Sequence, residues 1–274
     1  MSERIIAVCN RKGGVGKTTL VAGLAEVLSH RMRKKVLVID ADNQANATGA
    51  FGVENPEFTL NDVLYGDPAN NFQIVPGSAE DAIVPVSESW EGRDGGDPAP
   101  PINLIAAEEQ LAARELDTVM AREYRLKRAL AGVTERYDVI LIDCPPSLGL
   151  LTLNSLAAAT HALLVTEARV NSVAGLAKIV DTIVQVQENL NPALGFAGVV
   201  LNKVNDSRLD QQEWVSKIRS DFGDLVLDPM IPDHEPYAKF QSASVPLSGF
   251  GAKGKVARVA LEQLAANIWE RTAE

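Results

Sequence analysis

Several short stretches of the chain are apolar at nearly every position, without the alternation of a strand that has one face in water. Continuous Val, Ile, Leu and Ala runs of this length are typical of strands buried on both faces of a sheet. The runs are Arg4–Cys9, Lys35–Asp40, Asp138–Asp143, His161–Thr166 and Phe196–Leu201. They predict a sheet that is covered on both sides.

Between these runs, apolar residues recur with the spacing of a helix. Thr18–His30 and Ser172–Leu190 each carry an apolar stripe at intervals of three and four residues, and Ser172 is placed to cap the second helix. A last amphipathic helix is expected over Val256–Arg271. Strands that alternate with helices indicate βαβ units. We therefore predict an α/β fold, one domain over residues 1–274 with a mostly parallel, doubly wound sheet flanked by helices.

One stretch departs from this alternation. Ser87–Pro101 is rich in Gly, Pro and acidic residues, and we interpret it as a mobile surface loop, covering residues 87–101. It separates a short strand-like piece near Phe72–Pro76 from another at Ile102–Ala106. The apolar runs on both sides belong to one series, so the loop is not expected to divide the chain into domains.

Composition limits the binding partners and the cell compartment that we expect for the protein. A net charge of −10 argues against binding nucleic acid over the whole surface, although it leaves room for a local basic patch. Two cysteines, Cys9 and Cys144, make no disulfide framework or metal pair, which favours a reducing cytoplasm. The first residues run straight into a strand, and the last helix lacks a Lys/Arg-rich face. We expect a cytoplasmic protein without a signal peptide or membrane anchor.

The most informative motif is a glycine-rich loop that follows a strand and precedes a helix. Asn10–Thr19 reads NRKGGVGKTT, and Gly13, Gly14 and Gly16 let the backbone turn its N–H groups towards phosphate oxygens. The start of the next helix adds partial positive charge at the same place. The order of strand, loop and helix, together with the glycines of the loop, predicts a phosphate-binding loop.

The residues after the glycines complete such a loop. Lys17 is expected to reach the β- and γ-phosphates, Thr18 to offer its hydroxyl to Mg²⁺, and Thr19 to contact the α-phosphate. The ordinary G-x-x-x-x-G-K-[ST] pattern fails at its first position, where Arg11 stands in place of glycine. A second lysine, Lys12, lies within KGGVGKT.

The pattern KGGxGK[ST] resembles that of the deviant Walker-A ATPases, which include ParA-type partition proteins, MinD-type division-site proteins and relatives of the nitrogenase iron protein. Two further blocks strengthen the resemblance: VLVIDADNQANAT over Val36–Thr48 and DVILIDCPPS over Asp138–Ser147. Asn43 replaces the proline that is usual in the first of these. The resemblance implies ATP and Mg²⁺ as cofactors. The implied ATP-binding residues of the loop are Lys12, Gly13, Gly14, Val15, Gly16, Lys17, Thr18 and Thr19.

Carboxylates at strand ends are the second set of candidates. Asp143 ends a buried strand beside the phosphate loop, where ligands bind in open α/β sheets, and the resemblance makes it a magnesium carboxylate. Asp40 and Asp42 would point the same way if the extended geometry continued, and such a pair suits general-base or metal work. By resemblance, Asp42 activates the attacking water and Asp40 supports the phosphate loop and the magnesium shell.

Two later segments resemble the family's base pocket. Asn202, at the end of VVLNK, would pair with adenine, and Pro232 and Asp233 would line the pocket. An ordinary strand-end turn remains the alternative interpretation of these residues. The resemblance also implies that Lys12 reaches the nucleotide of a second copy, so that ATP holds a homodimer together and hydrolysis releases it.

Three functional classes fit this chemistry. A ParA-type partition ATPase binds DNA non-specifically and is stimulated by a centromere-binding ParB-type partner; a MinD-type ATPase cycles on membranes; a third class comprises enzymes of the same fold. Two strand-end cysteines and no tyrosine-rich tail disfavour the third class, and the QxNAT match favours the first. A stripe without acidic residues, from Pro236 to Leu261, offers a DNA contact, unless its charges are merely solvated. Its members are Lys239, Lys253, Lys255 and Arg258.

Overall fold

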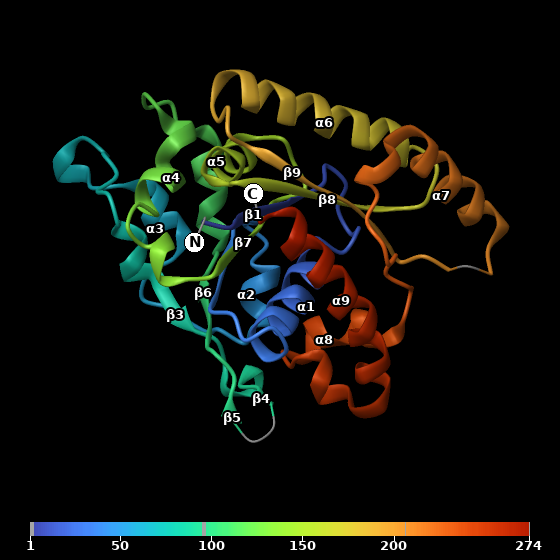
Figure 1. Ribbon diagram of the computed structural model, residues 1–274. Coiled ribbons are helices and arrows are strands. Elements are labelled where there is room, and N and C mark those ends of the chain that lie inside the picture. The colour runs from blue at the N-terminus through green and yellow to red at the C-terminus, as the bar shows by residue number, and fades with distance from the viewer. Residues whose placement is uncertain (1–2, 95–96, 206, 274) are drawn as a thin grey trace.

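A computed structural model describes residues 3–94, 97–205 and 207–273. Its centre is a sheet whose strands come from both halves of the sequence (Figure 1). The strands are β1 (Ile5–Cys9), β2 (Val36–Asp40), β3 (Ile83–Pro85), β6 (Ile102–Ile105), β7 (Val139–Asp143), β8 (His161–Glu167) and β9 (Gly195–Asn202). A separate two-stranded ribbon pairs β4 (Arg93–Asp94) with β5 (Asp97–Pro98).

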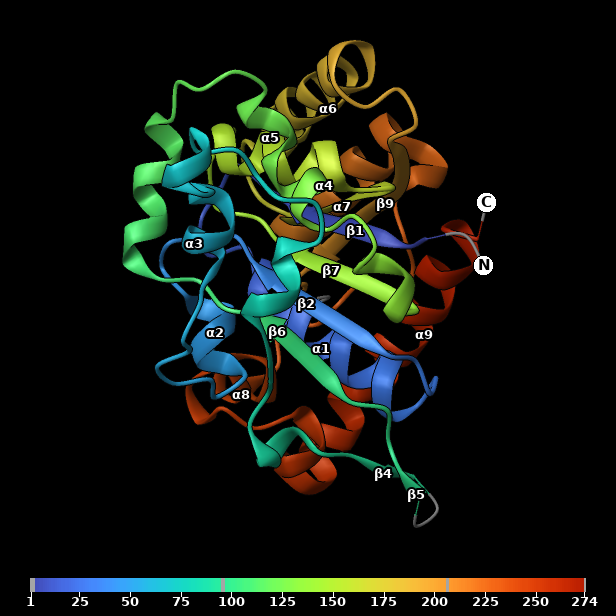
Figure 2. The same ribbon diagram turned by 90° about the vertical axis from the view of Figure 1, so that its left-hand side faces the viewer.

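Within the described residues the main sheet has the order β3-β6-β2-β7-β1-β8-β9, and neighbouring strands are parallel except for the β3–β6 pair (Figure 2). The strands β1, β2 and β7 are buried along their whole length, as the continuous apolar runs predicted. Register places Asp143 beside both Val8 and Asp40. The carboxyl ends of β1, β2 and β7 therefore meet at one edge, which is where the candidate site lies.

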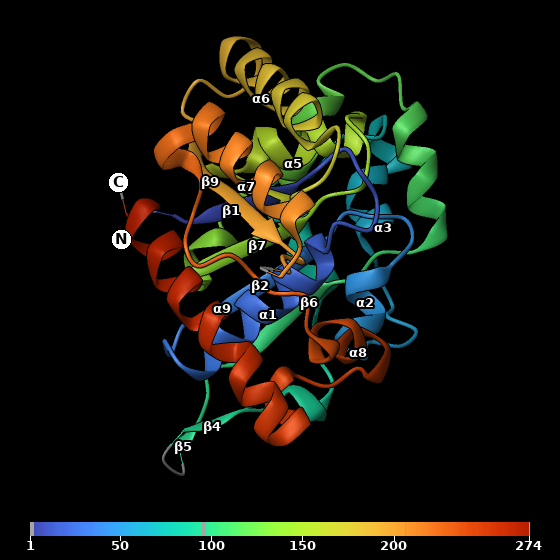
Figure 3. The ribbon, with the colours of Figure 1, turned by 90° about the vertical axis from the view of Figure 1, so that its right-hand side faces the viewer.

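Helices cover both faces of the sheet, so the predicted α/β class is confirmed (Figure 3). One core contains the long helix α1 and the C-terminal helices, and the other core contains the apolar sides of α5 and α6. The helices are α1 (Lys17–His30), α2 (Asn46–Ala50), α3 (Leu60–Tyr65), α4 (Arg125–Ala129), α5 (Leu150–Ala158), α6 (Ser172–Asn189), α7 (Leu209–Phe222), α8 (Glu235–Ala243) and α9 (Gly251–Arg271). Residues near the two ends of the chain lie together, where Arg4 Nε donates to the carbonyl oxygen of Thr272 at 3.1 Å.

Three local predictions differ from the structure. The stretch Phe72–Pro76 is not a strand of the sheet; the edge strand is Ile83–Pro85, which runs antiparallel to β6. Helix α6 has Asn171 at its N-cap, and the Ser172 hydroxyl donates to the carbonyl oxygen of Glu167 instead of capping the helix. The last helix starts at Gly251, five residues before the predicted Val256.

The segment 87–101 is anchored at a point that its composition does not reveal. Trp90 is fully buried, its ring lies 4.5 Å from that of Phe51, and its Nε1 donates to the carbonyl oxygen of Ala50 at 3.1 Å. The expected surface loop is therefore wrong at Trp90, because an indole that packs into the core outweighs its polar neighbours. Residues 95 and 96 lie outside the described part of the chain.

Candidate functional site

The phosphate loop connects β1 to α1 and is tied to strands on both sides. Gly14 and Gly16 have φ angles of 75° and 91°, which favour glycine. A Cβ atom on Gly16 would also come within 2.2 Å of Asn202 Nδ2, so only glycine fits there. Asn10 Oδ1 accepts from Lys12 N at 2.8 Å, and Asn10 Nδ2 donates to the carbonyl oxygen of Val165. The sequence pattern thus folds into a fixed loop.

The two lysines of the loop lie in different environments. Lys17, in the first turn of α1, is only 7% exposed and lies close enough to Asp143 for its charge to oppose the rise that burial causes in the pKa of that carboxyl. Lys12 is exposed, and no ion pair joins it to another described residue. One lysine therefore belongs to the interior of its own loop, whereas the other faces outwards.

Thr18 and Asp143 form the candidate magnesium site. Thr18 Oγ1 donates to Asp143 Oδ2 at 2.6 Å, while Asp143 Oδ1 is buried without a hydrogen-bond partner in the structure. Burial, then the neighbouring Asp40, raises the pKa of Asp143 to about 8, against the opposing effects of Thr18 and Lys17. An unpaired buried carboxylate oxygen beside a hydroxyl fits a hard cation.

The rest of a magnesium shell has to come from phosphate and water. Among the described residues, no cluster of three or more His, Cys, Asp or Glu side chains is arranged to hold a metal. Mg²⁺ commonly takes one or two protein ligands and completes its shell with phosphates and water. The residues present therefore fit a magnesium ion that arrives with a nucleotide.

Asp40 and Asp42 are brought close to Asp143 but differ in their surroundings. Asp40 is fully buried, and its oxygens accept from Asp42 N at 3.2 Å and from the N and Oγ1 of Thr48, both at 2.8 Å. Burial raises its pKa to about 6. Strand β2 ends at Asp40, and Asp42 Oδ1 accepts from Gln44 N at 3.1 Å in the following turn. The extended geometry assumed for this pair does not continue past the strand.

The two predicted base-pocket segments lie side by side. Val204 N donates to the carbonyl oxygen of Ile231 at 3.0 Å, and Asp233 N donates to that of Val204 at 3.1 Å, which places Pro232 beside Val204. Asn202 is buried and its Nδ2 donates to the carbonyl oxygen of Val15 at 2.8 Å. The Asn202 amide thus touches the phosphate loop itself.

Sequence reasoning missed Lys203 and Glu167. Lys203 Nζ donates to the carbonyl oxygen of Gly14 and lies 3.4 Å from Glu167 Oε1, while Arg169 Nε lies 2.7 Å from Glu167 Oε2. The register of the two strands brings Lys203 and Glu167 together, because Glu167 pairs with Asn202 across β8 and β9 and Lys203 follows Asn202. The signal in the sequence that could have located these two residues is a charged side chain at or just after the end of a predicted strand.

The basic stripe is more neutral than its sequence suggests. Glu235 lies just outside the stripe, and its oxygens pair with Lys239 at 2.6 Å and Lys253 at 3.2 Å. Arg258 is 17% exposed and lies 3.6 Å from the fully buried Glu26 and 3.1 Å from Glu262. Lys255 is exposed. Counterions from α1 and the start of α8 therefore balance three of the four predicted basic residues.

The sequence matches a family model described as an AAA domain over residues 3–196. The chain is 32% identical to the chromosome-partitioning ATPase Soj of Treponema pallidum, over 99% of this chain and 98% of that protein. It is also 32% identical to the sporulation initiation inhibitor protein Soj of Bacillus subtilis, over 96% and 99% of the two chains. The chain belongs to the ParA/Soj family of P-loop ATPases.

Solved structures share the fold of this chain. A structure named as cobyrinic acid a,c-diamide synthase from Mycobacterium smegmatis, with bound ADP and magnesium, is 30% identical with a TM-score of 0.74, and the match covers 97% of this chain and 93% of that one. Apo McdA from Cyanothece has a TM-score of 0.78 at 22% identity, with 98% of each chain covered, and shows the same fold. No helix within the described residues of this ParA-family chain is long and apolar enough to cross a membrane.

Proposed function

We propose that this protein is a partition ATPase that uses ATP and Mg²⁺ to control its own dimerisation and its binding to DNA. ATP holds two copies together, the dimer binds DNA without sequence preference on the nucleoid in the cytoplasm, and slow hydrolysis releases it. A DNA-bound, centromere-binding partner of the ParB type stimulates that hydrolysis. The partitioning names of the Soj relative from Treponema pallidum, and of a ParA from Myxococcus xanthus that is 32% identical over 92% of this chain, support the proposal.

The observation that carries the proposal is the contrast between Lys17 and Lys12. A phosphate loop needs one internal cation, and the buried Lys17 supplies it. Lys12 is exposed on the same loop, so its charge is available to a second molecule placed against that face. A cation delivered from a second copy would steady the charge on the transferring phosphoryl group and would make association depend on ATP.

The other roles are those that the family resemblance implies, and the contacts around the loop support them. Asp143 and Thr18 would hold the magnesium ion, which would supply positive charge to the phosphates when it is bound. Asp42, 7% exposed at the start of its turn, is the residue that positions the attacking water. Asp40 supports that turn through Asp42 N and Thr48.

Nucleotide recognition falls to the segments beside the loop. Asn202 would read adenine with Oδ1, because its Nδ2 is already engaged by Val15, and Pro232 and Asp233 would border the base. Gly13, Gly14 and Gly16 would surround the phosphates with backbone N–H groups.

The test is DNA binding by the intact chain with ATP, with ADP and without nucleotide, at several salt concentrations. We expect measurable affinity for long non-specific duplex with ATP alone, because two copies double the phosphate contacts on one duplex. Equal affinity with ATP and ADP would contradict the proposal. Binding to anionic vesicles with ATP, and not to DNA, would favour a MinD-type cycle in its place.

A further inference from the structure

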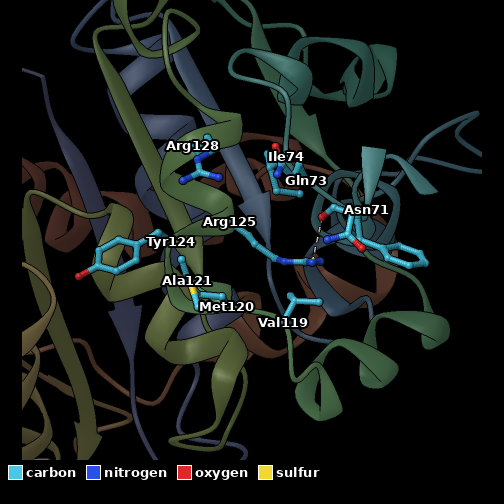
Figure 4. Close-up of a pocket in the computed structure, with 10 residues that line it drawn as sticks. Asn71, Gln73, Ile74, Val119, Met120, Ala121, Tyr124, Arg125 and Arg128 are labelled. Carbon is cyan, nitrogen blue, oxygen red and sulfur yellow. Dashed lines mark hydrogen bonds between the residues drawn. The ribbon is translucent and has the colours of Figure 1, made fainter. Parts of the chain in front are cut away.

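A cavity of about 550 Å³ lies far from the phosphate loop in the sequence, between a turn at residues 71–74 and the segment 119–128 (Figure 4). Ile74 and Val119 contribute apolar walls, and Tyr124 lies on the helical side. Arg125 reaches across from α4 towards the turn that carries Asn71. The cavity is therefore built from two segments that the sequence does not place together.

The lining of this cavity is positive on a protein that is negative overall. Two arginines, Arg125 and Arg128, line it, and none of the described lining residues is acidic, although the chain carries a net charge of −10. Arg125 is buried, pairs with Asp117 at 3.3 Å and donates to the carbonyl oxygen of Phe72 at 3.1 Å. Arg128 is exposed, and no ion pair joins it to a described residue. The charge that this cavity can accept is negative.

Apolar side chains stand at the mouth of the same cavity. Met120 is 97% exposed and Phe72 is 37% exposed. Exposed apolar groups gathered around a hollow mark an interaction site more often than an ordinary surface. Phe72 and Ala121 also have positive φ angles, of 57° each, which is an uncommon conformation for residues other than glycine.

We propose that this cavity is the docking site for a partner protein, which inserts a segment carrying both acidic and apolar side chains. A carboxylate of the partner pairs with Arg128, and its apolar side chains pack against Phe72 and Met120. Charge complementarity selects the occupant, since a basic segment would be repelled by the exposed Arg128 and a purely polar one would leave the apolar side chains uncovered.

Hydrogen bonds lead from the segment beside the cavity to α5 and from α5 to Ser147, four residues after the proposed magnesium carboxylate. Asn154, on α5, accepts from Leu126 N at 3.1 Å and donates to the carbonyl oxygen of Arg122 at 2.9 Å. The Glu115 carboxylate accepts from Leu150 N, the first residue of α5. The segment that lines the cavity is thus fixed to α5 at two points.

Helix α5 in turn holds the loop that follows Asp143. Thr152 Oγ1 donates to the carbonyl oxygen of Ser147 at 2.8 Å. A partner that shifts the segment 119–128 therefore moves α5 and the loop behind Asp143. We infer that docking raises ATP turnover, a step that rests on the proposed ATPase function, whereas the docking itself does not.

The test uses the full chain and three short fluorescent peptides, measured by anisotropy. In the first, leucine alternates with glutamate; in the second, glycine replaces leucine; in the third, lysine replaces glutamate. The wild-type protein should bind the first peptide saturably and the other two at least about tenfold more weakly. Arg128→Glu should weaken binding of the first peptide about tenfold or more. The matched control is Lys127→Glu, which makes the same change of charge one residue away, outside the cavity lining, and should bind like wild type.

Each other outcome overturns part of the proposal. No saturable binding, or equal loss in Arg128→Glu and Lys127→Glu, would remove the docking site. If the glycine peptide bound as tightly as the leucine peptide, the cavity would be a simple anion-binding site in which apolar contacts play no part. In a parallel ATPase assay, the first peptide should raise turnover by wild type and not by Arg128→Glu, whose basal rate should be normal. Peptide binding without such a rise would remove the coupling, and an absence of basal turnover would contradict the proposed function while leaving the docking result intact.

Discussion

The Thr18 hydroxyl donates a hydrogen bond to Asp143 Oδ2 at 2.6 Å and so joins the first turn of α1 to the end of β7. A hydroxyl that donates its proton to a carboxylate keeps its lone pairs for a cation. The second oxygen of Asp143 is buried and has no partner in the structure, which leaves it for the same ion. This pair is the part of the site whose chemistry is most sensitive to pH.

Without metal, the Asp143→Asn variant should become increasingly more stable than wild type as pH rises. Burial raises the pKa of Asp143 to about 8 from an ordinary 3.8, so the folded chain holds a proton that the unfolded chain has lost. Stability then falls with rising pH between about 4 and 8, by at most about 1.4 kcal/mol per pH unit. The Asp143→Asn variant should not lose stability in this way, because asparagine does not titrate. Mg²⁺ with nucleotide should stabilise only wild type, because the variant lacks the proposed magnesium carboxylate. Calorimetric unfolding at several pH values checks both effects; parallel pH curves for the two proteins would contradict the assignment.

Asp42→Ala should bind ATP and form the dimer but lose turnover, because the attacking water is no longer positioned. Asp67→Ala is a suitable control, since Asp67 Oδ1 caps a turn in the same way, accepting from Ala69 N at 2.8 Å, at a distant place. Turnover and sedimentation with ATP are the measurements. An Asp42→Ala protein that hydrolyses ATP at the wild-type rate would exclude Asp42 from the reaction.

Trp90→Ala should destabilise the fold by about 3–5 kcal/mol, the usual cost of truncating a fully buried large aromatic residue. The indole packs on Phe51 and donates to Ala50, so its loss leaves both a cavity and an unpaired carbonyl oxygen. Trp214 is half-buried on α7, and Trp214→Ala should cost clearly less. Urea unfolding compares the two variants; equal losses would show that Trp90 does not anchor the segment 87–101.

DNA binding should depend on Lys255, which is exposed. Lys255→Glu should weaken binding to any duplex and flatten the salt dependence by roughly one unit per lost contact. Arg258→Glu is unsuitable as a test of DNA contact, because it would place a second negative charge beside the buried Glu26 and should lower the stability of the fold. Lys127→Glu on α4 is the charge-matched control for Lys255→Glu in the duplex titration. Unchanged affinity and salt slope in Lys255→Glu would place the DNA contact elsewhere.

The parts of this molecule that the sequence predicts are those that depend on local pattern. Continuous apolar runs located the strands β1, β2, β7, β8 and β9 to within one residue, because a strand buried on both faces can contain little else. The edge strand β3 has only three residues and an antiparallel partner, so no run marks it.

Contacts between distant segments were beyond prediction. One of the two counterions of Arg258 is Glu26, which lies on α1 far away in the sequence, so a local count of acidic residues cannot include it. Trp90 is buried because Phe51 and the end of α2 receive it, although its neighbours in sequence are polar. The phosphate loop was predictable because its residues are adjacent in sequence, whereas the bridge from Lys203 to Glu167 required the register of two strands.

Sedimentation velocity of wild type and Lys12→Ala, each with ATP and Mg²⁺ and with ADP, tests the central claim most directly. Lys12 is exposed on a loop whose internal cation is Lys17, so its loss should spare nucleotide binding by the monomer. Wild type should sediment as a species of about twice the monomer mass with ATP and as a monomer with ADP. Lys12→Ala should bind ATP yet remain monomeric. A normal ATP-dependent dimer of Lys12→Ala, or a wild-type dimer that ignores the nucleotide, would contradict the account.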